Sequence, residues 1–262
     1  MSPHARERAR QQRRNKKRQS VLAQRALESR RNKQVLVIVL ILLVVVGGLV
    51  GVSLAVHKDD KPAAAAQPVA GCVAPPKVPT DHRTRTLPAK GTAAGKTFVA
   101  TVSTNCGIIS MELDGSKAPQ TVASFVGLAK SGYWVDSPCH RLTTTGIFVL
   151  QCGDPTGTGG GNPGYGFGVE NPPASFKYPA GTLAMARTTD PKTNGGQFFI
   201  VYKETELKDA AGYSIFGKIT SGMDIVDRIA AAGLATDANQ NAAPRQHISI
   251  LAVNVTEKKA SQ

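Results

Sequence analysis

The sequence predicts a mainly β domain that follows a single transmembrane helix. Three patterns support this: residues 1–34 are rich in Lys and Arg, residues 35–56 are apolar and uncharged, and residues 96–257 contain short apolar runs separated by Gly, Pro, Asn and Asp. These patterns are typical of a topogenic tail, a membrane span and a domain of short antiparallel strands. We therefore expect one folded domain over 96–257, with residues 258–262 as a C-terminal tail.

The first segment, residues 1–34, is a basic tail that we expect to be disordered. It holds 12 Lys and Arg against two acids, Glu7 and Glu28, and so carries ten of the chain's fourteen net positive charges. A basic run of this kind binds nucleic acid or anionic lipid. The apolar run that follows favours the membrane, and we expect no nucleic-acid partner. Recruitment of a cytoplasmic partner by the tail is a further hypothesis.

Residues 35–56 form the predicted transmembrane helix. These 22 residues would span about 33 Å as a helix, which matches a hydrocarbon core of about 30 Å. A cleaved signal peptide is the alternative, but its apolar region usually has only about 7–15 residues. Because Lys and Arg concentrate before the span, the positive-inside rule places the N-terminus in the cytoplasm. The sequence thus predicts a single-pass plasma membrane protein whose folded domain is extracytoplasmic.

Residues 57–95 are predicted to be a linker. They are rich in Ala, Pro, Lys and Thr and show neither helical nor strand periodicity, which is typical of a semi-extended spacer. Residues 69–72 resemble a lipoprotein cleavage box, but such a box should directly follow the apolar run. Lipidation of Cys72 is therefore the less favoured alternative.

Eight strands are predicted within the domain from short apolar runs between turn residues. An Asp-Gly turn follows the second of them, and Pro119 then suits the first turn of a helix. The strands are 97–103, 107–113, 139–143, 147–152, 181–186, 197–202, 214–219 and 247–256.

Two helices complete the expected fold. Val122, Phe125, Val126 and Ala129 recur at helical spacing, and residues 223–231 show a similar apolar face. Eight strands and two helices in a domain of this size suit a closed antiparallel barrel with capped ends, because closure removes exposed sheet edges.

Two segments carry a resemblance to a known family. Residues 139–168 contain a His-Arg pair, then Phe-x-x-Gln, Gly-Asp-Pro-Thr and a glycine-rich stretch; residues 181–202 contain Met-Ala, Asn-Gly and Gln-Phe-Phe-Ile. With Ser-Ile-Phe-Gly at 214–217, these motifs resemble those of cyclophilin-type peptidyl-prolyl cis-trans isomerases, in the same order and over about 96–257. The resemblance implies a cyclophilin-like barrel that isomerises X-Pro bonds without a cofactor or metal, on proline-containing polypeptides.

The residues suit this chemistry on physical grounds. Rotation about an X-Pro bond meets a barrier of about 18–20 kcal/mol and needs no nucleophile or proton transfer. A donor facing the amide nitrogen stabilises the twisted state selectively, and Arg141 has a permanently charged, planar set of donors. The resemblance assigns catalysis to Arg141 and its orientation to Gln151. It also implies that substrate contacts come from His140, Phe148, Val149, Ala186, Arg187, Gln197, Phe199, Leu207 and Tyr213.

The chain departs from the usual family pattern at three places around this site. Six residues, 142–147, separate Arg141 from Phe148 where the usual run has four. Glu206 stands where cyclosporin-sensitive members carry Trp, which predicts weak binding of that drug. Tyr213 stands where many members have His. We expect altered substrate preference with activity retained, because Arg141 is present.

The cysteines and glycines leave several alternatives open. Cys139 and Cys152 flank one predicted hairpin, so a disulfide between them is one expectation in an oxidising compartment. Cys106 is another candidate partner, and three buried thiols are the third alternative. A Cys/His metal site using His140 lacks paired Cys spacing. The glycines at 159, 161 and 164 match a dinucleotide fingerprint by spacing only, without its strand–helix context.

The sequence therefore favours an isomerase that acts on exported or cell-surface proteins during folding. The alternative is a non-catalytic module at the membrane, in which the same groove binds proline-containing peptides or serves as a scaffold. The presence of Arg141 favours the enzyme.

Overall fold

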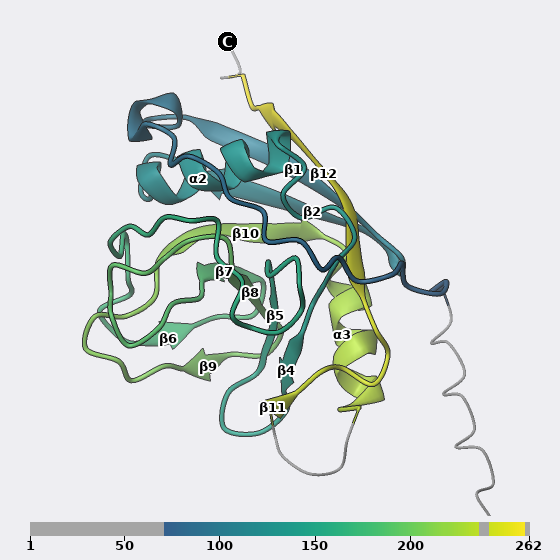
Figure 1. Cartoon of the computed structure of the whole chain (residues 1–262). Coiled ribbons are helices and arrows are strands. Elements are labelled where there is room, and N and C mark those ends of the chain that lie inside the picture. Colours follow the sequence, from purple (N-terminus) through teal and green to yellow (C-terminus); the bar gives the residue numbers. More distant parts are fainter. Residues whose placement is uncertain (1–70, 236–240, 260–262) are drawn as a thin grey trace, which may run out of the picture. The chain divides into compact units, whose positions relative to one another are not determined.

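The structure, a computed structural model, describes residues 71–235 and 241–259, most of which lie in or between β-strands (Figure 1). The predicted tail at 1–34 and the predicted span at 35–56 lie outside these residues. In the described part of the chain, no helix is both long and apolar enough to cross a membrane.

The described strands occur at all eight positions predicted from the sequence, with four additional two-residue strands. In chain order they are β1 (Thr97–Thr104), β2 (Gly107–Asp114), β3 (Ser137–Pro138), β4 (Arg141–Thr143), β5 (Val149–Cys152), β6 (Lys177–Tyr178), β7 (Thr182–Met185), β8 (Phe198–Val201), β9 (Thr205–Glu206), β10 (Ile215–Ser221), β11 (Asn241–Ala242) and β12 (Ser249–Glu257).

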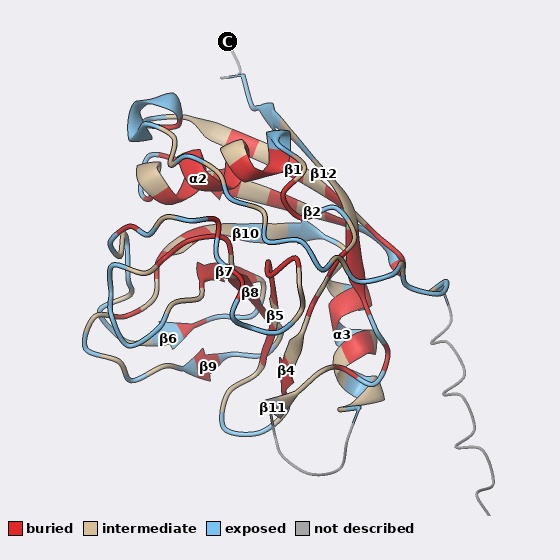
Figure 2. Cartoon of the chain, viewed as in Figure 1, coloured by how far each residue is buried: buried red, intermediate tan, exposed pale blue. Residues whose placement is uncertain are grey.

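Strand β1 shows why these segments form a half-buried sheet. Phe98, Ala100 and Val102 are buried, whereas the residues between them are partly exposed, as the period of two in a strand requires. β1 pairs in antiparallel fashion with β2 on one side and with β12 on the other. The inward face of this group contributes to the main core (Figure 2).

Helix α2 (Pro119–Lys130) covers that core. The predicted apolar face at Val122, Phe125, Val126 and Ala129 is buried, and Pro119 occupies the first turn. The residue before the helix provides no side-chain cap. The Glu170 carboxylate, from a distant loop, instead accepts hydrogen bonds from the backbone N–H groups of residues 120 and 121. An anion at this position accepts hydrogen bonds from the unpaired N–H groups of the first helical turn, and it interacts favourably with the positive end of the helix dipole.

Helix α3 (Met223–Ala232) packs its apolar side against the sheet through Ile225, Val226 and Ile229, all buried. It begins after Gly222, whose φ of 87° lies in the left-handed region. A Cβ at this position would also approach the carbonyl oxygen of Ile108 to 2.6 Å. Glycine is therefore required where the chain turns from β10 into α3.

The predicted closed, eight-stranded barrel is confirmed only as a curled sheet. Ten strands pair in the order β11-β4-β5-β8-β7-β10-β2-β1-β12-β3, and β6 and β9 form a separate pair. Two residues, Cys139 and His140, connect β3 at one end to β4 near the other, so the sheet curls back on itself. Among the described residues, no strand pair joins its two ends. The described residues thus show a curled, mainly antiparallel sheet, and its closure into a barrel stays a prediction.

Two apolar clusters fill the fold. The larger cluster lies around α2 and includes Phe125, Trp134 and Phe198, whose rings pack against one another. A smaller, separate cluster gathers beside β5, β7 and β8. The strands thus have two apolar faces, and the smaller cluster lies beside the candidate site.

Residues 71–95, part of the predicted linker, contact the folded domain; we term them the N-terminal strap. A disulfide joins Cys72 to Cys106 between β1 and β2. A short 3-10 helix, η1 (Lys90–Thr92), lies just before β1 and contacts α2. Ala93, which follows η1, is buried in the main core. The domain boundary at residue 96 stays a prediction, but the described residues before it contact the domain.

Candidate active site

The β4–β5 hairpin brings Arg141 opposite Gln151. The two residues are register partners in the antiparallel pair, so their side chains share one face of the sheet. Arg141 Nη1 donates a hydrogen bond of 2.9 Å to Gln151 Oε1. Burial lowers the pKa of Arg141 from its ordinary value, yet an arginine keeps its charge in proteins. The structure thus places a charged, oriented donor at the half-buried end of β4.

A chain of amide hydrogen bonds continues from this pair. Gln151 Nε2 donates to Gln197 Oε1 at 2.9 Å, and Gln197 Nε2 donates to the carbonyl oxygens of Gly159 and Gly161, both at 2.9 Å. Each amide therefore has its donor and its acceptor satisfied by a different neighbour. The orientation of Gln151 follows from this arrangement, since its oxygen must face Arg141.

The glycine-rich loop, residues 153–164, supplies those carbonyls and is folded around Asp154. The buried Asp154 carboxylate accepts hydrogen bonds from the N–H groups of Thr156, Gly159 and Gly161. Burial alone would raise the pKa of Asp154, but these hydrogen bonds, led by that from Gly161, outweigh it and lower the pKa below its ordinary value. An ionised Asp154 thus fixes the loop.

The smaller apolar cluster lies next to Arg141 along the same strands. Three predicted site residues belong to it or pack on it from adjacent elements: Val149 on β5, Phe199 on β8 and Tyr213 before β10. The Tyr213 ring meets the Phe199 ring edge-on, with centroids 5.7 Å apart. Predicted Ala186 and Leu207 also pack on this cluster. A floor of this kind suits an apolar ring such as that of proline.

Sequence reasoning missed further members of this cluster, namely Ile147, Tyr178, Ala184, Val201 and Ile215. Tyr178 is fully buried, and its hydroxyl accepts from Tyr213 N at 2.9 Å. It lies on the two-residue strand β6, where no pattern marks it. The period of two along β7 and β8 is the signal that could have identified Ala184 and Val201.

Phe148 makes different contacts from those of its neighbour Val149. Its ring meets the Tyr202 ring edge-on at 5.9 Å, and Lys203 Nζ lies 4.6 Å from its centroid. Successive residues of an extended chain point to opposite sides. A contact between Phe148 and the proline ring stays a prediction.

His140 lies between β3 and β4, half-buried beside Gly159. Burial is the main cause that lowers its pKa from 6.5; the charge of Asp154 opposes this, and that of Arg141 reinforces it. Neither ring nitrogen has a partner of regular hydrogen-bond geometry within the described residues, although the Gln197 amide is near enough to favour the protonated ring. The imidazole is therefore neutral at pH 7.

The Arg187 side chain is held by the 209–213 loop, and its expected contact with the substrate peptide stays a prediction. Its side chain is only 1% exposed and forms an ion pair with Asp209. It also donates to the carbonyl oxygens of Gly212 and Thr188, and its guanidinium lies 4.6 Å from the centroid of the Tyr213 ring. The charged group thus fixes the 209–213 loop, although the residue also borders the cavity described next.

A cavity of about 260 Å³ adjoins the amide chain. Four predicted site residues, Gln151, Ala186, Arg187 and Gln197, line it together with the glycine-rich loop. Its remaining lining residues are Gly159, Gly160, Gly161, Asn162, Thr188, Thr193, Gly195 and Gly196.

The departures predicted at the rim have clear positions. Within the six-residue segment 142–147, Thr143 Oγ1 accepts from Val149 N at 3.0 Å, which ties the loop back to β5, whereas Thr145 is exposed. Glu206 is exposed on β9, and Leu207 beside it packs on the smaller cluster. Residues 145 and 146 of the rim loop and Glu206 therefore lie at the surface, where they are open to a substrate.

All four cysteines of the chain lie in described residues and form two disulfides, Cys72–Cys106 and Cys139–Cys152. The second is the hairpin pairing that was one expectation, whereas Cys106 pairs with Cys72, a partner that no sequence pattern indicates. Residues 71–235 and 241–259 contain no group of three or more His, Cys, Asp or Glu side chains that could hold a metal ion.

Residues 99–255 match the family model described as cyclophilin type peptidyl-prolyl cis-trans isomerase/CLD. The probable peptidyl-prolyl cis-trans isomerase B of Mycobacterium tuberculosis is 38% identical over 199 residues, which are 70% of this chain and 63% of that protein. The chain thus matches less than two thirds of the mycobacterial protein's length. A peptidyl-prolyl cis-trans isomerase of Helicobacter pylori is 37% identical over 147 residues, covering 55% of this chain and 88% of that protein.

Solved structures show the same similarity. The crystal structure of a cyclophilin type peptidyl-prolyl cis-trans isomerase from Cryptosporidium parvum has a TM-score of 0.53 and 29% identity, and covers 62% of this chain and 99% of that one. A crystal structure of that protein in the presence of the dipeptide Ala-Pro has a TM-score of 0.51 and 30% identity, with 60% and 98% covered. Given the matched family model and the shared fold, the chain belongs to the cyclophilin-type peptidyl-prolyl cis-trans isomerase family.

Proposed function

We propose that this protein accelerates cis-trans isomerisation of X-Pro bonds in polypeptides. The observation that carries the proposal is the pairing of Arg141 with Gln151 beside an apolar cluster that includes Val149, Phe199 and Tyr213. An apolar site holds the proline ring while a charged donor faces the amide nitrogen. The Cryptosporidium relative crystallised with Ala-Pro supports a proline-containing substrate.

The arrangement fits the energetics of the reaction. In the planar amide, the nitrogen lone pair is delocalised, so it accepts a hydrogen bond only when the bond is twisted. A donor at this nitrogen therefore binds the transition state more tightly than the ground state, which lowers the barrier. Arg141 is a suitable donor because Gln151 and the amide chain behind it fix its direction before substrate binds.

We also propose that the clients are exported or cell-surface proteins. The apolar run at 35–56, preceded by the basic tail, supports a single-pass membrane protein with its isomerase domain outside the plasma membrane. The two disulfides support an oxidising compartment, since such bonds are rare in the cytosol. The membrane lipid would then contact residues 35–56.

The enzyme is tested with the purified full chain in detergent. Isomerisation of a proline-containing tetrapeptide and refolding of a proline-limited protein are measured for wild type, Arg141→Ala and Arg228→Ala. Arg228 is a matched control, because it lies on α3 in an exposed pair with Asp224. We expect Arg141→Ala to lower kcat/KM about 100-fold or more, as loss of a transition-state donor does, and the control to match wild type.

The competing outcome is a wild-type chain that binds the tetrapeptide, as titrated by fluorescence anisotropy, but leaves both rates unchanged. That result would replace the enzyme with a peptide-binding module. Topology is tested separately by adding protease to intact cells. Release of the domain supports the extracytoplasmic placement, whereas protection until lysis contradicts it.

A further inference from the structure

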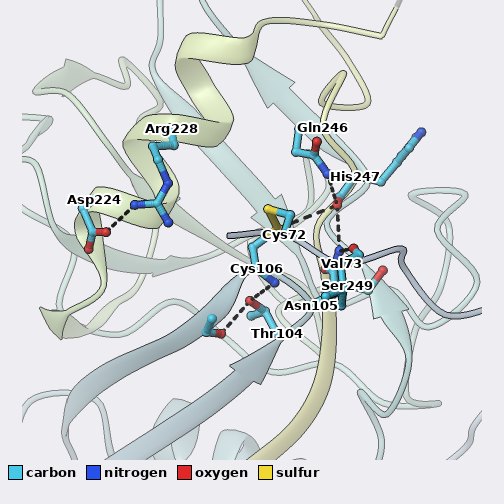
Figure 3. The surroundings of a disulfide bond; sticks show 11 residues. Cys72, Val73, Thr104, Asn105, Cys106, Asp224, Arg228, Gln246, His247 and Ser249 are labelled. Atoms are coloured by element: carbon cyan, nitrogen blue, oxygen red, sulfur yellow. Dashed lines mark hydrogen bonds and ion pairs between the residues drawn. A yellow bond between two sulfur atoms is a disulfide. The ribbon is translucent and has the colours of Figure 1, made fainter. Parts of the chain in front are cut away.

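The N-terminal strap, residues 71–95, contacts the domain at several separate places, although its sequence is typical of a spacer. At its start, the Cys72–Cys106 disulfide joins it to the turn between β1 and β2. Val73 N donates to the Asn105 carbonyl oxygen at 2.8 Å, and Asn105 Nδ2 donates to the Val73 carbonyl oxygen at 2.8 Å. Figure 3 shows the disulfide with these two residues beside it. The start of the strap is therefore fixed both covalently and by hydrogen bonds.

Two arginines in the middle of the strap, Arg83 and Arg85, bind backbone carbonyls of the segment that follows α2. The Arg83 side chain is 16% exposed, and its Nη1 donates to the carbonyl oxygens of Tyr133 at 2.9 Å and Val135 at 2.8 Å. Arg85 Nη2 donates to the Ser131 carbonyl oxygen at 3.1 Å. These carbonyls belong to residues 131–135, which follow α2, so the two arginines fix the strap on the turn that leaves the helix.

The same part of the strap also contacts the glycine-rich loop. Arg85 N donates a hydrogen bond of 2.7 Å to the Pro163 carbonyl oxygen. Gly164 lies against Thr84, since a Cβ built on Gly164 would be 3.4 Å from Thr84 Cγ2. The strap therefore contacts the far end of the loop, beyond the part that is fixed by Asp154.

This contact connects the strap to the candidate groove through a short series of hydrogen bonds. The loop carbonyls of Gly159 and Gly161 hold the Gln197 amide, and Gln197 in turn holds Gln151. Gln197 and the loop also line the cavity that adjoins the site. Displacement of the loop at Pro163 would therefore alter the groove without touching Arg141.

We propose that the strap is a positioning element of the isomerase, and that Arg83 and the Cys72–Cys106 disulfide hold it on the glycine-rich loop. It sets the geometry of the groove for the peptide segment preceding the proline. The inference rests on the proposed function, and it extends the functional domain to residue 71. A strap with this role affects substrate affinity more than the rotation step, because Arg141 and Gln151 keep their own strand pairing.

The test uses the full chain in detergent, with variants Arg83→Ala, Arg83→Lys, and Cys72→Ser combined with Cys106→Ser. Lys90→Ala is the matched control, because Lys90 is an exposed cation of the strap on η1. KM and kcat for a proline-containing tetrapeptide are measured separately, together with amide hydrogen exchange at Gly159 and Gly161. The thermal midpoint of each variant is measured as well, so that every assay is run at a temperature below unfolding.

We expect Arg83→Ala to raise KM about fivefold, the effect of about one lost hydrogen bond, and the double Ser variant, which releases the start of the strap, to raise KM as well. In both variants kcat should stay within about twofold of wild type. Exchange at Gly159 and Gly161 should quicken, Arg83→Lys should recover part of the affinity, and Lys90→Ala should match wild type. A lower thermal midpoint with unchanged KM and exchange would make the strap a stabilising segment only and overturn the proposal.

The two proposals fail in different ways. A wild-type chain without isomerase activity contradicts the proposed function, but hydrogen exchange still tests the strap. If exchange at Gly159 and Gly161 is then the same in wild type and Arg83→Ala, the positioning role is rejected as well.

Discussion

The guanidinium of Arg187 lies 4.6 Å from the centroid of the Tyr213 ring, and the same side chain is paired with Asp209. Tyr213 also contacts the Phe199 ring, and its backbone N–H donates to the Tyr178 hydroxyl. Tyr213 is thus held from two directions at the edge of the smaller apolar cluster. Where many family members have His, this chain has a tyrosine fixed by a buried cation.

This relationship predicts that Arg187 acts on substrate affinity through Tyr213. Arg187→Met retains much of the volume but removes the charge and the hydrogen bonds to Asp209 and Gly212. We expect KM to rise about fivefold to tenfold, since a desolvated cation–π contact and hydrogen bonds to a charged group are lost. Arg187→Lys should recover part of the effect, because it keeps the charge without the planar fork. Unchanged KM in Arg187→Met would contradict the role.

The lowered pKa of His140 predicts a loss of stability on the acid side of neutrality. The folded state holds the ring neutral, whereas the unfolded chain binds a proton as pH falls through 6.5. Stability should therefore decline as pH falls below 6.5, toward the lower folded-state pKa. The thermal midpoint of wild type and His140→Gln, measured from pH 7.5 to pH 5, checks this: the variant should show a flatter profile. Parallel profiles would exclude His140 as the cause.

A further decline at lower pH belongs to Asp154. Its folded-state pKa lies below the ordinary value of 3.8, so its contribution is present above that pH and is lost as pH falls through the folded-state pKa. The two declines are separable because His140→Gln removes only the first, and the second should be seen in both proteins when the thermal midpoint is also measured below pH 3.8.

The periodicity of strand residues and the pairing across one hairpin explain which parts of the fold and site could be predicted from the sequence. The strands β1 and β2 alternate between buried and less buried residues over most of their length, so their positions follow from the pattern. Arg141 and Gln151 end up opposite each other because they flank one hairpin. The disulfide between Cys139 and Cys152 follows from the same hairpin.

Other features depend on contacts that no local pattern records. The strap is held by side chains that reach backbone carbonyls, and by a disulfide from Cys72 to a turn 34 residues away. The inward direction of the Arg187 side chain depends on Asp209 and Gly212, which belong to a different loop. Backbone oxygens and distant partners leave no periodic trace in a sequence, so these features required the structure.

Gly161 should tolerate no larger residue, whereas its neighbour Gly160 should. A Cβ on Gly161 would overlap the Asp154 carboxylate, but a Cβ on Gly160 would meet only Thr158 Oγ1 at 3.6 Å. We expect Gly161→Ala to lower the free energy of unfolding by about 1–3 kcal/mol through overpacking and to raise KM. Gly160→Ala is the matched control in the same loop. Equal effects of the two substitutions on urea unfolding would refute this account.

The position of Glu206 predicts a gain of drug binding. Glu206 is exposed on β9 beside Leu207, which packs on the smaller apolar cluster. Cyclosporin-sensitive members of the family carry Trp at this position. We therefore expect Glu206→Trp to bind cyclosporin more tightly than wild type, as measured by isothermal titration calorimetry. Glu204→Trp, two residues away and also exposed, controls for a nonspecific aromatic effect. If Glu204→Trp gains as much affinity for cyclosporin as Glu206→Trp does, the gain does not depend on position 206 and the prediction is wrong.

The Cys139–Cys152 disulfide should stabilise the hairpin that carries the candidate catalytic residue. The bond closes a segment with a sequence separation of 13, and it joins Cys139, just before β4, to Cys152, the last residue of β5. Restricting a loop of this length in the unfolded chain contributes about 2–4 kcal/mol. Replacing both cysteines by Ala should therefore lower the free energy of unfolding by that amount, measured in urea. Because β4 and β5 also pair through backbone hydrogen bonds, the folded double Ala variant should keep most of its kcat at 10 °C. A loss of kcat as large as that of Arg141→Ala, in a variant still folded by circular dichroism, would instead mean that the disulfide itself positions Arg141.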